Sequence, residues 1–363
     1  MRLDGHARFP DGRAWHIHFE FTAPAAAEAA INPRPFLLAV LPLAMLHGLP
    51  IRCEHGVDAV TRRNLDRWGE TYAGWIPGRM RRVALELPEA DCVRSPDARG
   101  SLQAFSGGVD SCHTLVHRPK SARHAGLMVH GLDIPLGDTA GFCHAWEKSA
   151  EILRGTGAEA YQLRTNLRER NGIRPGPDWE TECHGIWLAA TLACLEPWFD
   201  TVIIPSTFSH DALTTPWGSH PQTDPLLGSA AVPYLHLGAE LDKLGKIASL
   251  AGNRLVTDRL RVCWQKGHAA ENCGRCFKCI ATQLCLRLSG VHDSAAFPKA
   301  CTADELAHLP IKEGSNRYLV TRLAETAREA GQADLAQALE RALVRARLRG
   351  LPRWLDRLGL RTP

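Results

Sequence analysis

The sequence lacks several features that would assign it to a specialised class. Its longest apolar run, residues 36–46, contains Pro42 and is shorter than the roughly 20 residues that a membrane-spanning helix needs. The formal net charge is only +4, which is too small to indicate a nucleic-acid-binding protein by itself. No internal repeat or low-complexity tract stands out. These absences argue against a membrane-spanning protein and a repeat protein.

The residues that are present are typical of a soluble globular protein with many thiols. Hydrophobic residues make up 45% of the chain and charged residues 23%, and 363 residues suffice for two or three domains with real cores. Residues 1–5 do not begin the charged-then-apolar pattern of an export signal. We therefore expect a cytoplasmic protein whose 12 cysteines stay reduced.

Residues 1–95 are expected to form a separate, small α+β domain. Trp15, Ile17, Phe19 and Phe21 alternate with polar residues, which is typical of a half-buried strand. Helices are predicted over residues 35–47 and 58–72, a strand over 82–87 and a linker over 95–100. This region carries no catalytic signature, so its role is left open.

From residue 101 the pattern changes to strands that alternate with helices, over a predicted domain of residues 101–260. Strands are expected at residues 102–105, 125–129, around Gln162 and Leu163, and at 201–205, with helices at 111–118, 142–153 and 183–195. Such alternation predicts an α/β fold with a parallel sheet and helices on both faces. Residues 291–363 are expected to be helical, with helices over 315–330, 332–347 and 352–360.

Six residues between the first of these strands and the helix after it form a candidate phosphate-binding loop. They are Ser106, Gly107, Gly108, Val109, Asp110 and Ser111. Adjacent glycines permit a close approach of the backbone, and N–H groups at a helix start can bind an anion beyond the end of a parallel strand. Asp110 suits the Mg²⁺ that accompanies phosphates. The alternative is a plain strand–helix turn that Asp110 caps.

The same six residues match the SGGxDS loop of the N-type ATP pyrophosphatases, and the chain resembles this PP-loop superfamily. The resemblance implies a Rossmann-like sheet of the adenine-nucleotide alpha-hydrolase type. It also implies that ATP is cleaved between its α and β phosphates. A substrate oxygen is adenylylated, pyrophosphate leaves, and a nitrogen or sulfur nucleophile displaces AMP. By position alone, His130 falls where adenine lies in this superfamily.

A second motif is formed by Cys263, Cys273, Cys276 and Cys279. Four thiolates at this spacing can close a tetrahedral Zn²⁺ site, with Gly274 allowing the sharp turn, and a closed site of this kind has a structural role. Reduced spectator cysteines, an iron–sulfur cluster and a redox pair remain alternatives. His268 lies inside the loop and is expected to be merely exposed. The other eight cysteines are expected in the core.

The two motifs together resemble the 7-cyano-7-deazaguanine synthases, the nitrile-forming family of queuosine precursor synthesis. The resemblance covers residues 102–288 and implies a four-cysteine zinc segment, predicted over residues 261–290, after the nucleotide domain. It does not reach the N-terminal or C-terminal regions.

Residues 205–229 differ from that family where it faces its substrate. The family has an Asp followed by a Tyr-Pro-Asp-Cys-Arg-Pro segment. Asp211 matches the first Asp, but Gln222 and Asp224 replace the later Asp and Arg. This charge reversal would repel a carboxylate that an Arg attracts, so we expect a different substrate. The expected substrate-binding residues are Asp211, Trp217, His220 and Asp224.

Two lysines on the next expected helix, Lys243 and Lys246, complete the predicted catalytic set with Asp110. The family keeps a phosphate-contacting lysine near here, and either residue can correspond to it; a solvated helix face is the alternative. Glu180, Glu182 and His184 are set aside, because acidic residues at a helix start usually interact with its dipole.

We therefore expect an ATP- and Mg²⁺-dependent, Zn²⁺-containing ligase. It would adenylylate a small-molecule carboxylate or amide and use ammonia or an amine to form an amide or a nitrile. A tRNA-modifying or sulfur-transfer enzyme, and a component that modifies a macromolecule within a larger complex, are the alternatives. A protein partner bound through residues 1–95 or through the basic C-terminal residues, and a homodimer, are left open.

Overall fold

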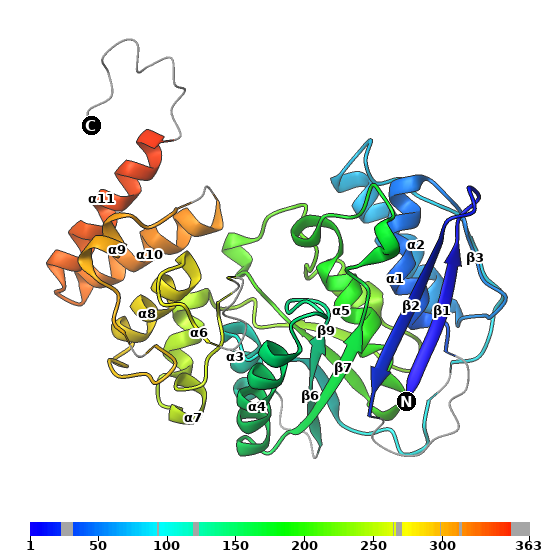
Figure 1. The fold of residues 1–363 in the computed structure, drawn as a ribbon, viewed down its shortest axis with the longest axis horizontal. Helices are drawn as coiled ribbons and strands as arrows, with labels where there is room; N and C mark the ends of the chain where they lie inside the picture. Colours follow the sequence, from blue (N-terminus) through cyan, green and yellow to red (C-terminus); the bar gives the residue numbers. More distant parts are fainter. Residues whose placement is uncertain are drawn as a thin grey trace, which may run out of the picture. The chain divides into compact units, whose positions relative to one another are not determined.

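The computed structural model describes residues 1–22, 32–92, 94–118, 123–263, 265, 271–297, 299–311 and 314–349 (Figure 1). The chain forms two compact units. Met1–Thr207 and Leu213–Ala239 form the sheet unit, and Phe208–Ala212 and Glu240–Pro363 form the helical unit. Within the described residues, no helix has the length and apolar character needed to cross a bilayer.

The sheet unit is built on a seven-stranded sheet of order β1-β2-β7-β6-β5-β8-β9. The five strands from β7 to β9 are mutually parallel, and β1 and β2 add an antiparallel hairpin at one edge. Taken in chain order, the parallel strands are arranged third, second, first, fourth, fifth. The strands are β1 (Arg2–Arg8), β2 (Ala14–Phe21), β5 (Ser101–Ala104), β6 (His124–His130), β7 (Glu159–Thr165), β8 (Thr201–Pro205) and β9 (Tyr234–Leu237).

Helices cover both faces of this sheet, as the alternating pattern predicts. On one face, Gln103 of β5 donates to the carbonyl of Ser111 in α3 (Val109–His117) at 2.9 Å. On the same side of the sheet, Gly126 of β6 has no Cβ and lies against Leu153 of α4 (Thr139–Gly155). On the other face, Leu102 and neighbouring apolar residues join the core of α5 (His184–Leu192). The sheet therefore separates two apolar layers.

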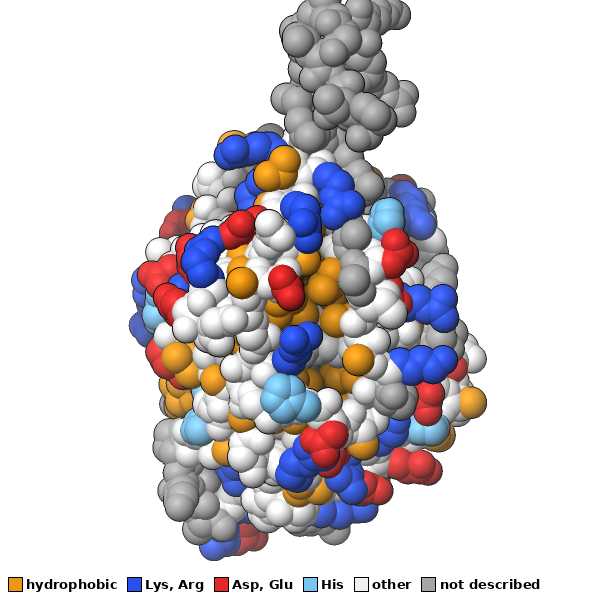
Figure 2. Space-filling model, turned by 90° about the vertical axis from the view of Figure 1, so that its left-hand side faces the viewer, with side chains coloured by type: hydrophobic (Ala, Val, Ile, Leu, Met, Phe, Trp, Pro, Cys, Tyr) orange, Lys and Arg blue, Asp and Glu red, His pale blue; other side chains and the backbone are white. Residues whose placement is uncertain are grey.

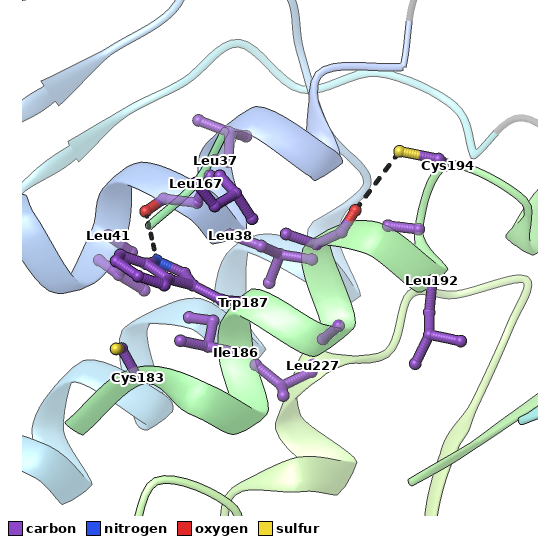
Figure 3. Packing of buried hydrophobic residues seen from close by; sticks show 14 of the residues in the cluster. Leu37, Leu38, Leu41, Leu167, Cys183, Ile186, Trp187, Leu192, Cys194 and Leu227 are labelled. Atoms are coloured by element: carbon purple, nitrogen blue, oxygen red, sulfur yellow. Dashed lines mark hydrogen bonds between the residues drawn. The ribbon is translucent and has the colours of Figure 1, made fainter. Parts of the chain in front are cut away.

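Residues 1–95 do not form a separate domain, and that prediction is wrong. Strand β2 pairs with β7, so that Phe19 lies beside Thr165 in the common sheet. Helix α1 (Arg34–His47) packs on α5, where Nε1 of Trp187 donates to the carbonyl of Ala39 at 2.9 Å (Figure 3). The apolar faces of the hairpin and of α1 are buried against the sheet unit, so they complete its core.

A buried ion pair also ties α1 to this unit. The guanidinium of Arg34 donates to both carboxylate oxygens of Glu196, at 2.7 and 3.2 Å, and to Thr61 of α2 (Ala59–Trp75) at 2.7 Å. Both partners are at most 5% exposed, and Tyr234 of β9 donates to Glu196 at 2.9 Å. A separate, small parallel pair is formed by β3 (Ile51–Arg52) and β4 (Leu85–Glu86), and β4 covers only two residues of the strand predicted over 82–87.

The helical unit begins at Glu240, so the predicted limits at residues 260 and 290 do not separate compact parts. Leu335, Leu339 and Ala342 of α11 are buried, and α11 packs on α10. The predicted helix over residues 352–360 lies outside the described residues. In the view of Figure 2, basic and acidic side chains are interspersed around apolar ones, without a large area of one charge sign. The helices are α6 (Lys243–Leu250), α7 (Arg254–Thr257), α8 (Phe277–Leu288), α9 (Ala303–Ala307), α10 (Ser315–Glu329) and α11 (Ala333–Arg349).

Candidate functional site

The loop of residues 106–111 connects β5 to α3 at a topological switch point. Strand β5 ends at Ala104, and α3 begins at Val109 with Gly108 as its N-cap. After β5, the chain adds β6 and then β7 on one side of β5. It then adds β8 and β9 on the other side, so the direction of strand addition reverses between β5 and β8. Ligands of open parallel sheets bind beyond the strand ends at such a reversal.

The loop has the conformation expected of an anion-binding turn. Gly107 has φ +71°, which L side chains rarely adopt. Within the loop, Ser106 N donates to Ser111 Oγ at 3.3 Å and Ser111 Oγ donates to Gly108 O at 3.1 Å. The loop leads directly into the N-terminus of α3, and helix N-termini are common binding sites for anions. Asp110, half-buried in the first turn, can supply one oxygen to a cation bound with that anion.

His130 is built into its own connection. Its Nε2 donates to the carbonyl of Pro135 at 3.0 Å, and its ring stacks on Phe142 with centroids 4.4 Å apart. Burial lowers the pKa of His130, and the bond to a carbonyl requires a proton on Nε2. The next residue, Gly131, has φ +105°, and a Cβ there would lie 1.8 Å from the carbonyl oxygen of Thr165. Any contact to adenine here would come from this backbone turn.

The four residues predicted to bind substrate are divided between the two units. Asp211 is exposed in the helical unit, in a short 3₁₀ helix (His210–Ala212). There it lines a cavity of about 540 Å³ together with Ser209, Asp242, Tyr318 and Arg322. Trp217, His220 and Asp224 lie in the sheet unit, where His220 and Asp224 are joined by a hydrogen bond.

Asp224 is the centre of a buried polar cluster that includes a histidine absent from the sequence prediction. Oδ2 of Asp224 accepts hydrogen bonds from Nδ1 of His236 at 2.7 Å and from Oγ of Ser219 at 2.6 Å. Oδ1 accepts from the backbone N–H of His220 at 3.2 Å. The side chains of His236 and Asp224 are only 2% and 1% exposed.

In a neutral ring, the bond to Asp224 places the proton of His236 on Nδ1, so that Nε2 is an acceptor. That atom is buried and has no hydrogen-bond partner among the described residues. The arrangement can accept a proton or a donor group from a bound molecule. His236 was missed because β9 (Tyr234–Leu237) was not predicted; its signal is a lone polar side chain in the short sequence Tyr-Leu-His-Leu.

Trp217 and His220 are held by packing against α2 and the start of α5. The carbonyl of Trp217 accepts from the hydroxyl of Tyr72 at 2.7 Å, and its ring meets His184 edge-on at 5.5 Å. His220 meets Trp75 edge-on at 5.0 Å, and burial lowers its pKa. Both residues therefore belong to an aromatic–histidine cluster on one face of the sheet.

Glu182, which precedes α5, forms an ion pair with Arg79. It accepts hydrogen bonds from Arg79 and from the backbone N–H of Asp178, at 2.7 Å for the latter. It is 2% exposed. An acid–base role for Glu182 therefore has no support.

The two candidate lysines differ sharply in environment. Lys243 is the first residue of α6 and is half-buried, near the thiol of Cys285. Lys246, one turn later, is only 1% exposed. Burying an ammonium group is costly unless it is paired, so a buried lysine points to a specific role. Sequence spacing alone does not distinguish the two.

The four predicted metal ligands come together in the helical unit. The sulfurs of Cys263, Cys273, Cys276 and Cys279 all lie within 4.8 Å of one another. Cys263 and Cys276 are 4.0 Å apart and Cys273 and Cys279 are 3.9 Å apart, close to the ~3.8 Å that tetrahedral Zn–S bonds of about 2.3 Å require. The donor set fits a structural Zn²⁺, and four sulfurs also suit an iron–sulfur cluster.

Surrounding groups hold these sulfurs in place. Gly274 has φ +77°, as the predicted sharp turn requires, and the N–H of Cys276 points to the sulfur of Cys273 at 3.4 Å. Asn272 accepts from the N–H groups of Val262 and Cys263 at 2.9 and 3.2 Å. A hydrogen bond from Cys279 lowers the pKa of the Cys276 thiol to about 5, which favours a thiolate there. His268 lies outside the described residues.

The remaining cysteines follow the expected core pattern only in part. Cys112, Cys183, Cys194 and Cys285 are buried, whereas Cys143 is exposed on α4, so the prediction is wrong for that residue. The other three are Cys53, Cys92 and Cys301, which are partly exposed. Burial raises the pKa of Cys112, the thiol nearest the 106–111 loop.

No protein-family model, curated protein or solved structure matches this chain.

Proposed function

We propose that this protein is an ATP-dependent, AMP- and pyrophosphate-forming enzyme of the PP-loop type. It activates a carboxylate or amide for amide or nitrile formation. The observation that carries the proposal is the 106–111 loop, with its positive-φ glycine and helix start, at the strand-order reversal. The 3-2-1-4-5 order of the parallel strands, which is that of Rossmann-like nucleotide-binding sheets, supports the same assignment.

The proposed chemistry is cleavage of ATP between its α and β phosphates, with the loop binding the phosphates. A substrate oxygen attacks the α-phosphorus of ATP, the bond to the bridging oxygen breaks, and pyrophosphate leaves. For a carboxylate, ammonia or an amine then attacks the activated carbon, its proton passes to a base, AMP leaves and an amide forms. For an amide, no nucleophile adds: after adenylylation of the amide oxygen, the N–H protons pass to a base, the C–O bond breaks as AMP leaves, and a nitrile forms. The N–H groups at the start of α3 stabilise the charge that develops on pyrophosphate.

Individual side chains have separate roles in this scheme. Asp110 would hold Mg²⁺, which supplies charge neutralisation when bound. The two lysines that the resemblance associates with the phosphates, Lys243 and Lys246, lie on α6 in the helical unit, where Lys246 is 1% exposed and Lys243 is half-buried. Cys263, Cys273, Cys276 and Cys279 would hold a structural Zn²⁺.

The substrate is expected to differ from 7-carboxy-7-deazaguanine. Asp224 stands where the resembling family has Arg, and its two oxygens are engaged by Ser219, His220 and His236. A buried carboxylate of this kind favours a donor or cationic group over an anion.

Sulfur transfer to tRNA has less support. The thiol nearest the loop, Cys112, is fully buried, and its raised pKa disfavours the thiolate that a sulfur carrier uses. Interspersed charges on the face in Figure 2 also offer no continuous basic surface for RNA.

The test is the identity of the nucleotide products. Protein is incubated with α-labelled ATP, Mg²⁺, ammonium and fractionated small molecules from a cell extract, and AMP and pyrophosphate are quantified. We expect both products in equal amounts with at least one fraction, and loss of turnover in Asp110→Asn but not in Asp97→Asn, which changes an exposed carboxylate of no assigned role. Release of ADP and phosphate, or an unaffected Asp110→Asn variant, would contradict the proposal.

A further inference from the structure

A cavity of about 750 Å³ lies in the sheet unit, lined by the β1–β2 hairpin, α1 and residues around β3. None of its lining residues belongs to the 106–111 loop or to the polar cluster around Asp224. Its volume is within the range of about 300–1,000 Å³ that is usual for small-molecule sites. The function proposed above does not use this cavity.

The cavity exists because α1 is apolar on two sides. One side, with Leu38 and Leu41, packs on α5 (Figure 3). The other side presents Phe36 and Val40, which line the cavity and are only half-buried. Gly5 of β1 lets Phe36 lie against the strand, since a Cβ there would be 2.5 Å from its ring. The part of the lining that Phe36 and Val40 form is therefore apolar.

A buried donor also lines the cavity. Trp15 is 0% exposed, and its indole Nε1–H has no acceptor among the described residues. A buried donor without an acceptor costs about 1–3 kcal/mol, and buried polar groups normally find partners. An acceptor on a bound molecule would remove this cost.

The rim adds a positive charge. Arg8, at the end of β1, lines the cavity and is exposed, and it has no carboxylate partner in the described parts of the chain. The other charged lining residues are neutralised: Arg52 pairs with Glu86 at 2.5 Å, and Asp4 pairs with Arg2 and His16. An anionic group at the rim would complement Arg8.

We propose that this cavity is a second ligand site, for a small amphipathic anion. The apolar body of the ligand packs on Phe36 and Val40, an acceptor atom meets the Trp15 N–H, and a carboxylate or sulfonate lies beside Arg8. The site is independent of ATP, so it can be tested whether or not the proposed function holds.

The test is a fluorescence and calorimetric titration of the full chain with anilinonaphthalenesulfonate, an aromatic body that carries an anion. We expect one saturable site per chain. Val40→Phe, which fills the cavity, and Arg8→Glu, which reverses the rim charge, should each weaken binding about tenfold or more. Trp15→Phe, which keeps an aromatic ring but removes the N–H, should weaken it by about fivefold. Val344→Asp and Arg63→Glu, exposed residues on α11 and α2, serve as controls and should leave binding unchanged.

Displacement then defines the ligand chemistry. Dodecanoate and naphthoate should displace the probe, and dodecanol, which lacks the anion, should do so at least about tenfold more weakly. Because Arg8 is exposed, Arg8→Glu is not expected to unfold the chain, and the circular dichroism spectrum of the variant should match that of the wild type. Probe binding that does not saturate, or that is unchanged in both Val40→Phe and Arg8→Glu, would overturn the proposal.

Discussion

Nδ1 of His236 donates to Oδ2 of Asp224 at 2.7 Å, with both side chains almost completely buried. This bond joins β9 to the 3₁₀ helix Asp224–Leu227 and, through Ser219, to the preceding loop. It leaves Nε2 of His236 buried and without a partner among the described residues. The carboxylate of Asp224 therefore holds β9 next to the 3₁₀ helix and the loop before it, although the sequence pattern gives no sign that these segments meet.

Asp224→Asn should be strongly destabilising. An amide presents only one oxygen to the donors of Ser219, His220 and His236, and its NH₂ group meets N–H donors. We expect the free energy of unfolding in urea to fall by about 2–4 kcal/mol. Asp211→Asn is the matched control at an exposed position and should change it by less than about 0.5 kcal/mol. Equal effects of the two substitutions would contradict the role given to Asp224.

Glu196→Gln should destabilise the sheet unit, because it leaves the buried guanidinium of Arg34 without a counter-charge. The expected loss is about 3–5 kcal/mol of unfolding free energy. Glu86→Gln breaks a similar pair with Arg52, but that pair is exposed, so a change of at most about 1 kcal/mol is expected. Chemical denaturation of both variants measures the difference. A small effect of Glu196→Gln would show that α1 is not anchored by this pair.

The stability of the sheet unit should depend on pH through His124. Burial lowers the pKa of His124 to about 3, below its ordinary value of about 6.5, while Ser101 and Gln103 hold its two ring nitrogens at 2.7 and 3.1 Å. Below pH 6.5 the unfolded chain takes up a proton that the folded chain does not, so stability decreases as pH falls from 6.5 toward 3. Between pH 7 and pH 5 this one group accounts for a loss of about 2 kcal/mol.

The check is the difference in unfolding free energy between pH 7 and pH 5 for the wild type and for His124→Gln. The variant should show a pH-dependent loss about 2 kcal/mol smaller than the wild type. An identical pH dependence in the two proteins would mean that His124 titrates normally in the folded state.

Metal content tests the cysteine cluster. The protein purified without oxygen should carry one colourless Zn²⁺ per chain, and Cys276→Ser should lose it, whereas Cys143→Ser, at an exposed cysteine outside the cluster, should retain it. Removing the metal with a chelator should lower the melting temperature. If the protein instead carries stoichiometric iron and sulfide and absorbs visible light, the cluster is an iron–sulfur centre and not a zinc site. That result would favour a sulfur-transfer function.

Local patterns in the sequence predicted much of the fold. Alternating apolar residues predict β2, and the helical periods of α1, α4 and α10 are confirmed within a few residues. Spacing alone predicts the cysteine cluster, because three of its ligands lie within seven consecutive residues. These features depend on interactions between near neighbours in the chain.

Features that depend on distant contacts were not predictable. Nothing near Phe19 indicates that its strand pairs with Thr165, so the local pattern predicts a separate domain over residues 1–95. Strand β9 has four residues and follows Pro233, which gives too short a pattern to recognise. His236 and the burial of Lys246 therefore became apparent only from the folded arrangement.

The most direct test of the central claim is the binding of ATP to the 106–111 loop. Calorimetry with ATP and Mg²⁺ should show one site per chain that pyrophosphate competes for. Gly107→Ala places a Cβ at φ +71° in the loop and should weaken ATP binding about tenfold or more. Gly157→Ala, at φ +75° in an open turn after α4, introduces the same backbone strain elsewhere and should leave binding unchanged. Equal ATP affinity in the wild type and Gly107→Ala, or no competition by pyrophosphate, would contradict the assignment of this loop.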